Sequence, residues 1–449
     1  MSRVLCVDVG STWTKAALVD TDSGALLGTA STPTTSPSAA HPGGDVLHGV
    51  DALAAQLGVG QGVGSATGEQ VEVRLCSSAG GGLRLAVVGH ERLVTAEAGR
   101  RVGLSAGAKV VHVAAGELDG EGLRALRAAK PDVVLLVGGT DGGNAEVLTH
   151  NAARLAAARW ATPIVVAGNA EAAPVVSDLL AATGRRFVVT DNVVPRIGVI
   201  APTGARAAIR ETFLRHVIGG KGLSRGPRFA GLVRSATPDA VLRGVEMLAV
   251  AADADVLVVD VGGATTDVYS VVTPRGEDAT LAKEVVAPLW HARTVEADLG
   301  MRWSAPTVLE AAEREHLAVP AGLADHVDAV ARDVSHRAEA AGEWRLETAL
   351  AATAATIAVR RHGRPGTPTE DARPLLDVAL LVGSGGVLRH APGAVGGVLG
   401  PLLRDHGGGW RVPRAARALV DEDYVLFAAG LLADTHAAAA RALAATLLH

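Results

Sequence analysis

In two short stretches of the chain, an apolar run is followed by an aspartate, a glycine and several hydroxyl residues. They are VLCVDVGSTWTKAALV, which starts at Val4, and VLVVDVGGATTDVYSVV, which starts at Val256. Asp8 and Asp260 occupy the same place in the two stretches. Each pattern predicts a buried strand, a tight glycine turn and a second strand. The repeat therefore predicts a duplicated site for gripping phosphate.

The residue types at both turns suit a phosphate group held together with a metal ion. Glycine has no Cβ atom, so backbone N–H groups can approach an anion closely. Asp8 and Asp260 cannot favour a bare phosphate, and we expect them to hold Mg²⁺ through water. The glycine and hydroxyl residues at the turns are Gly10, Ser11, Thr12 and Thr14, and Gly262, Gly263, Thr265 and Thr266.

A third stretch, LLVGSGGVLRH, ends at His390 and predicts a buried strand that leads directly into a helix. Its Gly383, Ser384, Gly385 and Gly386 suit close approach by a planar ligand or a phosphate. Each of the three stretches alone also fits an ordinary turn, and it is their order along the chain that favours a nucleotide site. Lys15 could also reach a phosphate, although side-chain alternation along its strand leaves its direction open.

The order of these motifs resembles the actin/heat-shock-chaperone/sugar-kinase ATPase superfamily. The resemblance implies an α/β fold of two lobes, each a duplicated ribonuclease H-like domain on a mixed sheet, that close over Mg²⁺ and ATP. It assigns Asp8 and Gly10 to Thr12 to the first phosphate motif and Gly383 to Gly386 to the adenosine motif. The second phosphate motif would take Asp260, Gly262, Gly263, Thr265 and Asp267.

Within that superfamily the chain resembles the MutL/GlmL family, which is unrelated to the mismatch-repair protein of similar name. The resemblance covers nearly the whole chain and rests on SSAGGGLRLAVVG, TAEAGRRVGLSAGAKV, LLVGGTDGGN, NVVPRIGV, RTVEADLGMRW and LVGSGGVLRH. It implies a chaperone or reactivating factor for an adenosylcobalamin-dependent mutase, similar to glutamate mutase, with ATP and ADP as ligands. Composition and spacing by themselves carry no sign of cobalamin.

The chain between the two hairpins predicts alternating strands and helices. VEVRLCSSAGGGLRLAVVG reads as two strands around a glycine turn, and the run from PDVVLLVGG to RFVVTDN reads as βαβ units with parallel strands. We expect a first lobe with this insert at 1–220, a linker and helix at 221–254, and a second lobe at 255–430. The C-terminal helices, 423–449, could pack back on the first lobe.

The composition limits the classes of protein to which the chain can belong. The 449 residues are too many for one ordinary core, and 48% hydrophobic with 20% charged residues is typical of a globular chain. A net charge of −5 gives no attraction to nucleic acid or anionic lipid. No run is apolar enough for a membrane helix, Asp8 interrupts the first apolar run, and Cys6 and Cys76 are the only cysteines. These features predict a cytoplasmic protein in a reducing compartment.

Two further segments have alternative interpretations. Asp141, in GGTDGGN, could cap the following helix or contact a ligand. The segment from Arg293 to Trp303 could form surface ion pairs, or it could position water or a lobe interface. No histidine spacing predicts a metal site in the protein beyond Mg²⁺.

Three functions are open at this point. The first is the ATPase chaperone or reactivating factor, and the second is a small-molecule kinase that would use Asp141 or Asp298 as its catalytic carboxylate. The third is a filament-forming protein, which we rank last because no exposed hydrophobic loop is evident. The residues also leave open whether the chain forms a homodimer or needs a small second subunit.

Overall fold

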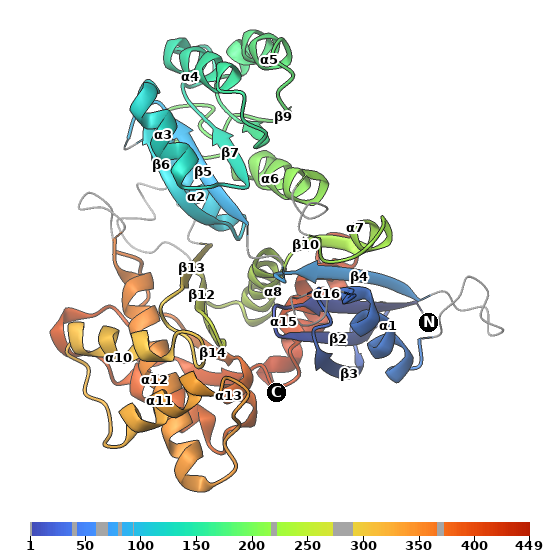
Figure 1. Cartoon of the computed structure of the whole chain (residues 1–449), viewed down its shortest axis with the longest axis vertical. Coiled ribbons are helices and arrows are strands. Elements are labelled where there is room, and N and C mark those ends of the chain that lie inside the picture. The colour runs from blue at the N-terminus through green and yellow to red at the C-terminus, as the bar shows by residue number, and fades with distance from the viewer. Residues whose placement is uncertain are drawn as a thin grey trace. The chain divides into compact units, whose positions relative to one another are not determined.

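The described part of the computed structural model contains three five-stranded sheets. The structure describes residues 2–37, 43–59, 71–79, 83–92, 94–216, 222–272, 291–365 and 372–449. Within these ranges the chain divides into two units (Figure 1). The first takes residues up to 241 together with 291–292 and 430–439, and the second takes 242–272, 293–429 and 440–449.

The first sheet of the first unit is built around a hairpin. Its strands are β1 (Arg3–Val9), β2 (Trp13–Asp20), β3 (Leu26–Pro33), β4 (Glu72–Ser77) and β10 (Val233–Ala236), in the order β10-β4-β1-β2-β3. Strands β1, β2 and β3 are antiparallel neighbours, whereas β4 runs parallel to β1 and β10 runs parallel to β4. Every residue of β1 after Arg3 is buried, which agrees with its apolar sequence.

The sheet of the second unit repeats this arrangement. Its strands are β11 (Val256–Val261), β12 (Thr266–Val271), β13 (Ala292–Glu296), β14 (Leu380–Ser384) and β15 (Arg417–Val420), in the order β13-β12-β11-β14-β15. Strand β12 is antiparallel to β11, β14 is parallel to β11, and β15 is parallel to β14. Counted from its own first strand, each sheet has the order 3-2-1-4-5. The duplicated, two-unit actin-like fold is therefore confirmed.

The third sheet is the insert predicted between β4 and β10. Its parallel strands are β5 (Arg84–Gly89), β6 (Lys109–Ala115), β7 (Val133–Leu136), β8 (Ile164–Val166) and β9 (Phe187–Val189), in the order β6-β5-β7-β8-β9. Strands β4 and β5 form as expected but belong to different sheets, and the glycine turn at 80–82 lies outside the described residues.

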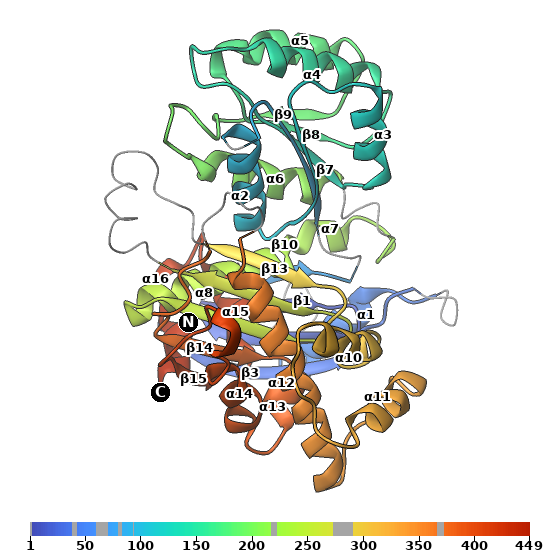
Figure 2. The same ribbon diagram turned by 90° about the vertical axis from the view of Figure 1, so that its left-hand side faces the viewer.

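Helices cover both faces of the inserted sheet (Figure 2). They are α2 (Thr95–Ser105), α3 (Gly120–Ala128), α4 (Glu146–Ala157), α5 (Ala173–Ala181) and α6 (Pro202–His216). Val102 of α2 and Ile209 of α6 pack with one set of alternating strand residues. Leu126, Leu148 and Val176, from α3, α4 and α5, pack with the other set. Because both faces are covered, the strands β7 and β8 are apolar throughout.

The helical part of the second unit is divided into several segments rather than one. Its main helices are α10 (Ala305–Arg314), α11 (Leu323–Arg332), α12 (Ala341–Gly363), α13 (Gly386–His390), α14 (Gly400–Leu403) and α15 (Val425–Leu432). Helix α12 packs against β11 and β12, and one π-helical turn, η3 (Val395–Leu399), precedes α14. No helix among the described ranges is both long and apolar enough to cross a membrane.

A close backbone approach occurs between α15 and α8 (Thr237–Ala252), at residues of the second unit. An ideal Cβ atom on Gly244 would lie 1.9 Å from the carbonyl oxygen of Leu426. Any side chain at this position must push the two helices apart.

Gly244→Ala should therefore lower the free energy of unfolding by at least about 2 kcal/mol, since overpacking forces backbone shifts. Gly342→Ala is the matched control, because a Cβ atom at that position in α12 meets no atom within 4 Å. Thermal denaturation of both variants checks this. A Gly244→Ala protein as stable as the wild type would show that the helices are not in contact there.

Candidate functional site

The two predicted phosphate turns have the same backbone structure. The N–H of Gly10 donates to the carbonyl of Trp13 at 3.1 Å, and the N–H of Gly262 donates to that of Thr265 at 2.9 Å. A Cβ atom at Gly10 would lie 2.7 Å from the Trp13 oxygen, so glycine is required for this tight closure. In each hairpin the donor glycine lies two residues after the aspartate, which is the second-to-last residue of its strand.

Backbone donors are available at the tips of both turns. Within the described part of the chain, the N–H groups of Ser11, Thr12, Gly263 and Ala264 donate to no protein atom. Ser11 and Thr12 are exposed, and so are Gly263 and Ala264. Unpaired N–H groups on a sharp turn are suited to anions. Each turn can thus bind phosphate without rearranging its own hydrogen bonds.

Asp8 is buried and is held by three side chains of the first unit. It is 3% exposed, and its Oδ1 accepts a hydrogen bond from the Thr237 hydroxyl at 2.5 Å and one from the Cys76 thiol at 3.6 Å. Lys15 Nζ lies 3.9 Å from Asp8 Oδ2, directly across the hairpin. Burial raises the pKa of Asp8, and Lys15, Thr237 and Cys76 partly offset that rise. Lys15 therefore points toward Asp8, which the sequence left open.

In the second hairpin the residue across from Asp260 is Asp267, so two carboxylates face each other. Asp267 is neutralised by Arg293, whose Nε and Nη2 lie 2.8 and 2.5 Å from Asp267 Oδ1. The Thr265 hydroxyl donates to Asp267 Oδ2 at 3.1 Å. Burial is the largest single influence on the pKa of Arg293 and lowers it, but the charges of and hydrogen bonds to Asp267 and Tyr269 together raise that pKa by more, so Arg293 stays ionised.

The third motif lies against the second hairpin. Ser384 is level with Asp260 in the pairing of β14 with β11, and Gly385 follows with a φ of 104°. A Cβ atom on Gly385 would lie 2.2 Å from the Val261 oxygen and 3.1 Å from Asp260 Oδ1. The structure therefore brings the second phosphate motif and the predicted adenosine motif together at one edge of the second sheet.

A segment that the sequence left ambiguous supports the second turn from behind. The N–H of Met301 donates to Gly262 O at 3.0 Å, and those of Arg302 and Trp303 donate to Gly263 O at 2.8 and 3.0 Å. Arg302 also pairs with Glu347, which is 1% exposed, at 2.9 Å. Surface ion pairs therefore describe only part of this segment: Arg293 and Glu347 are buried, and backbone hydrogen bonds from 301–303 hold the turn.

Asp298 and Asp141 are both engaged in structural contacts. Asp298 accepts from Arg361 Nη1 at 2.8 and 3.0 Å. Asp141 accepts from the Ala170 N–H at 2.9 Å and from Asn192 Nδ2 at 2.8 Å. The prediction that Asp141 caps the helix after it is wrong. Its carboxylate instead ties the loop after β7 to the start of a later helical turn.

Two polar residues were not predicted from the sequence. One follows the fifth strand of the first sheet and the other follows the fifth strand of the second. Thr237 follows β10 and contacts Asp8, while Asp421 follows β15. Asp421 is 1% exposed and accepts from the N–H groups of Val425 and Leu426 at 2.7 and 3.2 Å, which caps α15. The duplication could have revealed them, because both residues hold the same place in the repeated order of strands.

The residues present fit Mg²⁺ bound mainly by phosphate and water. No cluster of three or more histidine, cysteine, aspartate or glutamate side chains suited to a metal ion occurs in the ranges described. Magnesium, however, commonly uses one or two carboxylates together with substrate phosphates and retained waters. Asp8, whose Oδ1 is already hydrogen bonded to Thr237, suits an indirect contact through water.

Comparison with known proteins confirms the family resemblance. A family model described as MutL protein matches residues 4–448. A protein from Clostridium tetanomorphum named Protein MutL is 34% identical over 468 aligned positions, covering 97% of this chain and 96% of that protein.

Solved structures resemble the chain more distantly. The ethanolamine utilization protein EutJ from Carboxydothermus hydrogenoformans is 11% identical with a TM-score of 0.32, covering 99% of this chain and 90% of its own. A hexokinase of the ROK type from Thermus thermophilus is 13% identical with a TM-score of 0.29, covering 99% and 98%. The strand order that the two sheets share shows the duplicated fold without these distant matches.

Burial of Asp421 predicts a pH dependence of stability. Burial raises its pKa from 3.8 to about 6, so its contribution to stability is complete below pH 3.8 and is lost as the pH rises through about 6. The loss is roughly 3 kcal/mol at most. Asp421→Asn keeps an acceptor for the cap but does not titrate. Denaturation midpoints should therefore shift in favour of the variant as the pH rises, and parallel pH profiles would contradict this.

Proposed function

The chain belongs to the MutL protein family, and on that premise we propose that it is an ATP-hydrolysing chaperone or reactivating factor for an adenosylcobalamin-dependent mutase in the cytoplasm. The observation that carries the nucleotide part is the pair of equivalent turns. Each has a glycine-closed hydrogen bond, free N–H groups at its tip and an aspartate at the strand end. The mutase as client is implied by the family alone.

Each turn would bind a different part of one nucleotide. The N–H groups of Ser11 and Thr12 would donate to phosphate oxygens from the first hairpin, and those of Gly263 and Ala264 from the second. Gly383 to Gly386 would receive the adenosine. When bound, Mg²⁺ would neutralise phosphate charge, with Asp8 and Asp260 ordering its waters.

Useful work on a partner requires that the nucleotide distinguish two conformations of the protein. ATP has a γ-phosphate that ADP lacks, so only ATP would engage phosphate donors of both hairpins at once. A ligand shifts an equilibrium only by its differential affinity, and about a 100-fold difference corresponds to ~2.7 kcal/mol. We propose that this shift alternately opens and closes the two lobes and so loosens a damaged corrinoid in the client.

A small-molecule kinase on the same fold is the alternative. It would need a carboxylate free to accept a proton from the acceptor hydroxyl. Asp298 is bound to Arg361, and Asp141 is bound to Asn192 and a backbone N–H. These contacts favour the chaperone over the kinase.

The test is ATP hydrolysis by the full chain with and without an adenosylcobalamin mutase blocked by an inactive corrinoid. We expect the blocked mutase to stimulate hydrolysis and active mutase to return in the presence of ATP. If several blocked mutases leave the hydrolysis rate unchanged while a small metabolite is required for hydrolysis, the kinase function would replace the chaperone function. ATP-dependent pelleting at high speed would favour a filament protein.

Asp260→Ala should reduce ATP turnover on the order of 10²-fold or more, the usual scale for removing a key electrostatic group. Asp377→Ala, an exposed carboxylate in the loop before β14, is the matched control and should keep wild-type turnover. Steady-state phosphate release measures both. Normal turnover in a folded Asp260→Ala protein would refute the role assigned to Asp260.

A further inference from the structure

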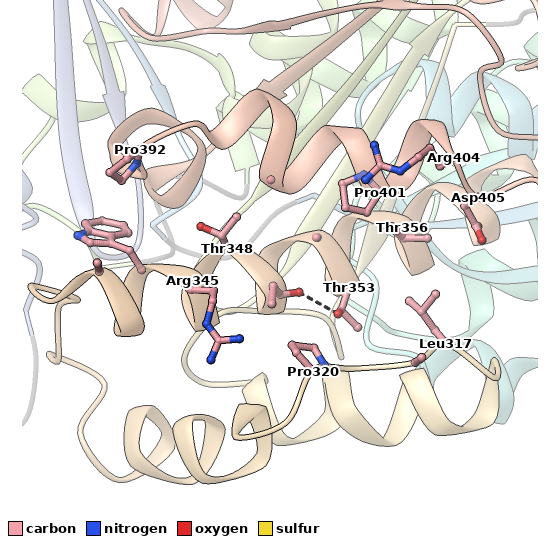
Figure 3. A pocket seen from close by; sticks show the side chains of 16 residues that line it. Leu317, Pro320, Arg345, Thr348, Thr353, Thr356, Pro392, Pro401, Arg404 and Asp405 are labelled. Carbon is pink, nitrogen blue, oxygen red and sulfur yellow. Dashed lines mark hydrogen bonds between the residues drawn. The ribbon is translucent and has the colours of Figure 1, made fainter.

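A cavity of about 650 Å³ lies within the second unit, along one side of α12. In Figure 3 its floor is α12, with Pro401 and Arg404 on one side and Leu317 and Pro320 on the other. The volume falls in the range of roughly 300–1,000 Å³ that is typical of small-molecule sites. Neither phosphate turn nor the stretch from Gly383 to Gly386 contributes to its lining.

Small side chains and a close backbone contact create this space. The face of α12 that lines it carries Ala341, Ala349 and Ala352, and these small side chains leave room beside larger ones such as Trp344. On the opposite wall, Gly397 lies in the π-helical turn η3, and a Cβ atom there would come 2.5 Å from Thr348 Cγ2. Single π-turns within helices occur frequently at functional sites. The wall therefore approaches α12 closely at Gly397, where any Cβ atom would require Thr348 to shift.

One hydroxyl that lines the cavity makes no hydrogen bond within the described part of the protein. Thr356 lines the cavity and is 2% exposed, yet its hydroxyl bonds no atom in the portion of the chain described. Thr353, one turn earlier, donates instead to the Ala349 carbonyl at 2.8 Å. The hydroxyl oxygen is not sealed from solvent, so it is available for a hydrogen bond to a polar atom of a ligand in the cavity.

The charged residues at the cavity leave an excess of positive charge. Asp405 is neutralised by Arg360, with both Nε and Nη2 at 2.6 Å from its oxygens. Arg345 and Arg404 also line the cavity and are exposed, and neither forms an ion pair with any described residue. Guanidinium groups bind carboxylate, sulfonate and phosphate oxygens by paired hydrogen bonds.

We propose that this cavity is a second ligand site, separate from the nucleotide motifs, for a small organic anion with an apolar body. The apolar body lies on the alanines of α12 and against Trp344 and Leu317. A polar atom of the ligand bonds the Thr356 hydroxyl, and the anionic group binds Arg345 or Arg404. This site is independent of the proposed function, because no residue assigned to ATP or Mg²⁺ takes part.

The probe for this site is 8-anilinonaphthalene-1-sulfonate, which joins an aromatic body to one sulfonate. Fluorescence titration of the full chain should show saturable binding that survives saturating Mg²⁺ and ATP. At least one of the variants Arg345→Glu and Arg404→Glu should weaken binding about tenfold or more, since the arginine that binds the sulfonate is replaced by a carboxylate that repels it. Ala352→Phe, which fills the cavity, should abolish it. Arg414→Glu, an exposed arginine that does not line the cavity, is the matched control.

Neutral N-phenyl-1-naphthylamine tests the charge requirement and should bind at least about tenfold more weakly than the sulfonate. Equal binding of the two probes would overturn the anion specificity. Wild-type binding by both arginine variants would overturn the site, and these exposed substitutions keep the test valid if Ala352→Phe does not fold. Competitive displacement by ATP would show that the cavity belongs to the nucleotide site and would also overturn the proposal.

Discussion

One hydrogen bond, made twice, sets the geometry on which the candidate site depends. It joins Gly10 to Trp13 in the first unit and Gly262 to Thr265 in the second. Closing the turn at that point fixes the register of each hairpin, so that Asp8 is level with Lys15 and Asp260 with Asp267. It also leaves the N–H groups at the tip without partners. Without this closure the strands could not present a carboxylate and free donors side by side.

The same turn is stabilised by different charges in the two units. In the first unit a lysine stands across from the aspartate, and a threonine and a thiol complete its surroundings. In the second unit the facing residue is itself an aspartate, and Arg293 must enter from the neighbouring strand to compensate it. The segment after Arg293 then continues behind the turn, where the N–H groups of Met301, Arg302 and Trp303 donate to the carbonyls of Gly262 and Gly263.

Local patterns made the hairpins, the inserted parallel sheet and the order of motifs predictable from the sequence. A strand such as Val256–Val261 is recognisable in the sequence by its apolar residues and the glycine that follows it. The contacts that could not be predicted join residues that are distant in sequence. Thr237 meets Asp8 only because β10 joins a sheet begun more than 200 residues earlier, and Asp141 bonds Asn192 because two loop ends converge. The cavity over α12 likewise depends on packing among segments that no local pattern relates.

The position of the insert also has a consequence for how the chain acquires its structure. All five strands of the inserted sheet are contiguous in sequence, so it can complete its pairing without the rest of the chain. The first sheet cannot, because β10 pairs with β4 across the whole insert. Closing that long loop while the insert is a coil carries a large entropic cost, whereas a folded insert brings its own ends within a fixed distance. During synthesis the inserted sheet should therefore form before the edge strand β10 docks. The sheet that contains the first hairpin should be completed only after the insert has folded.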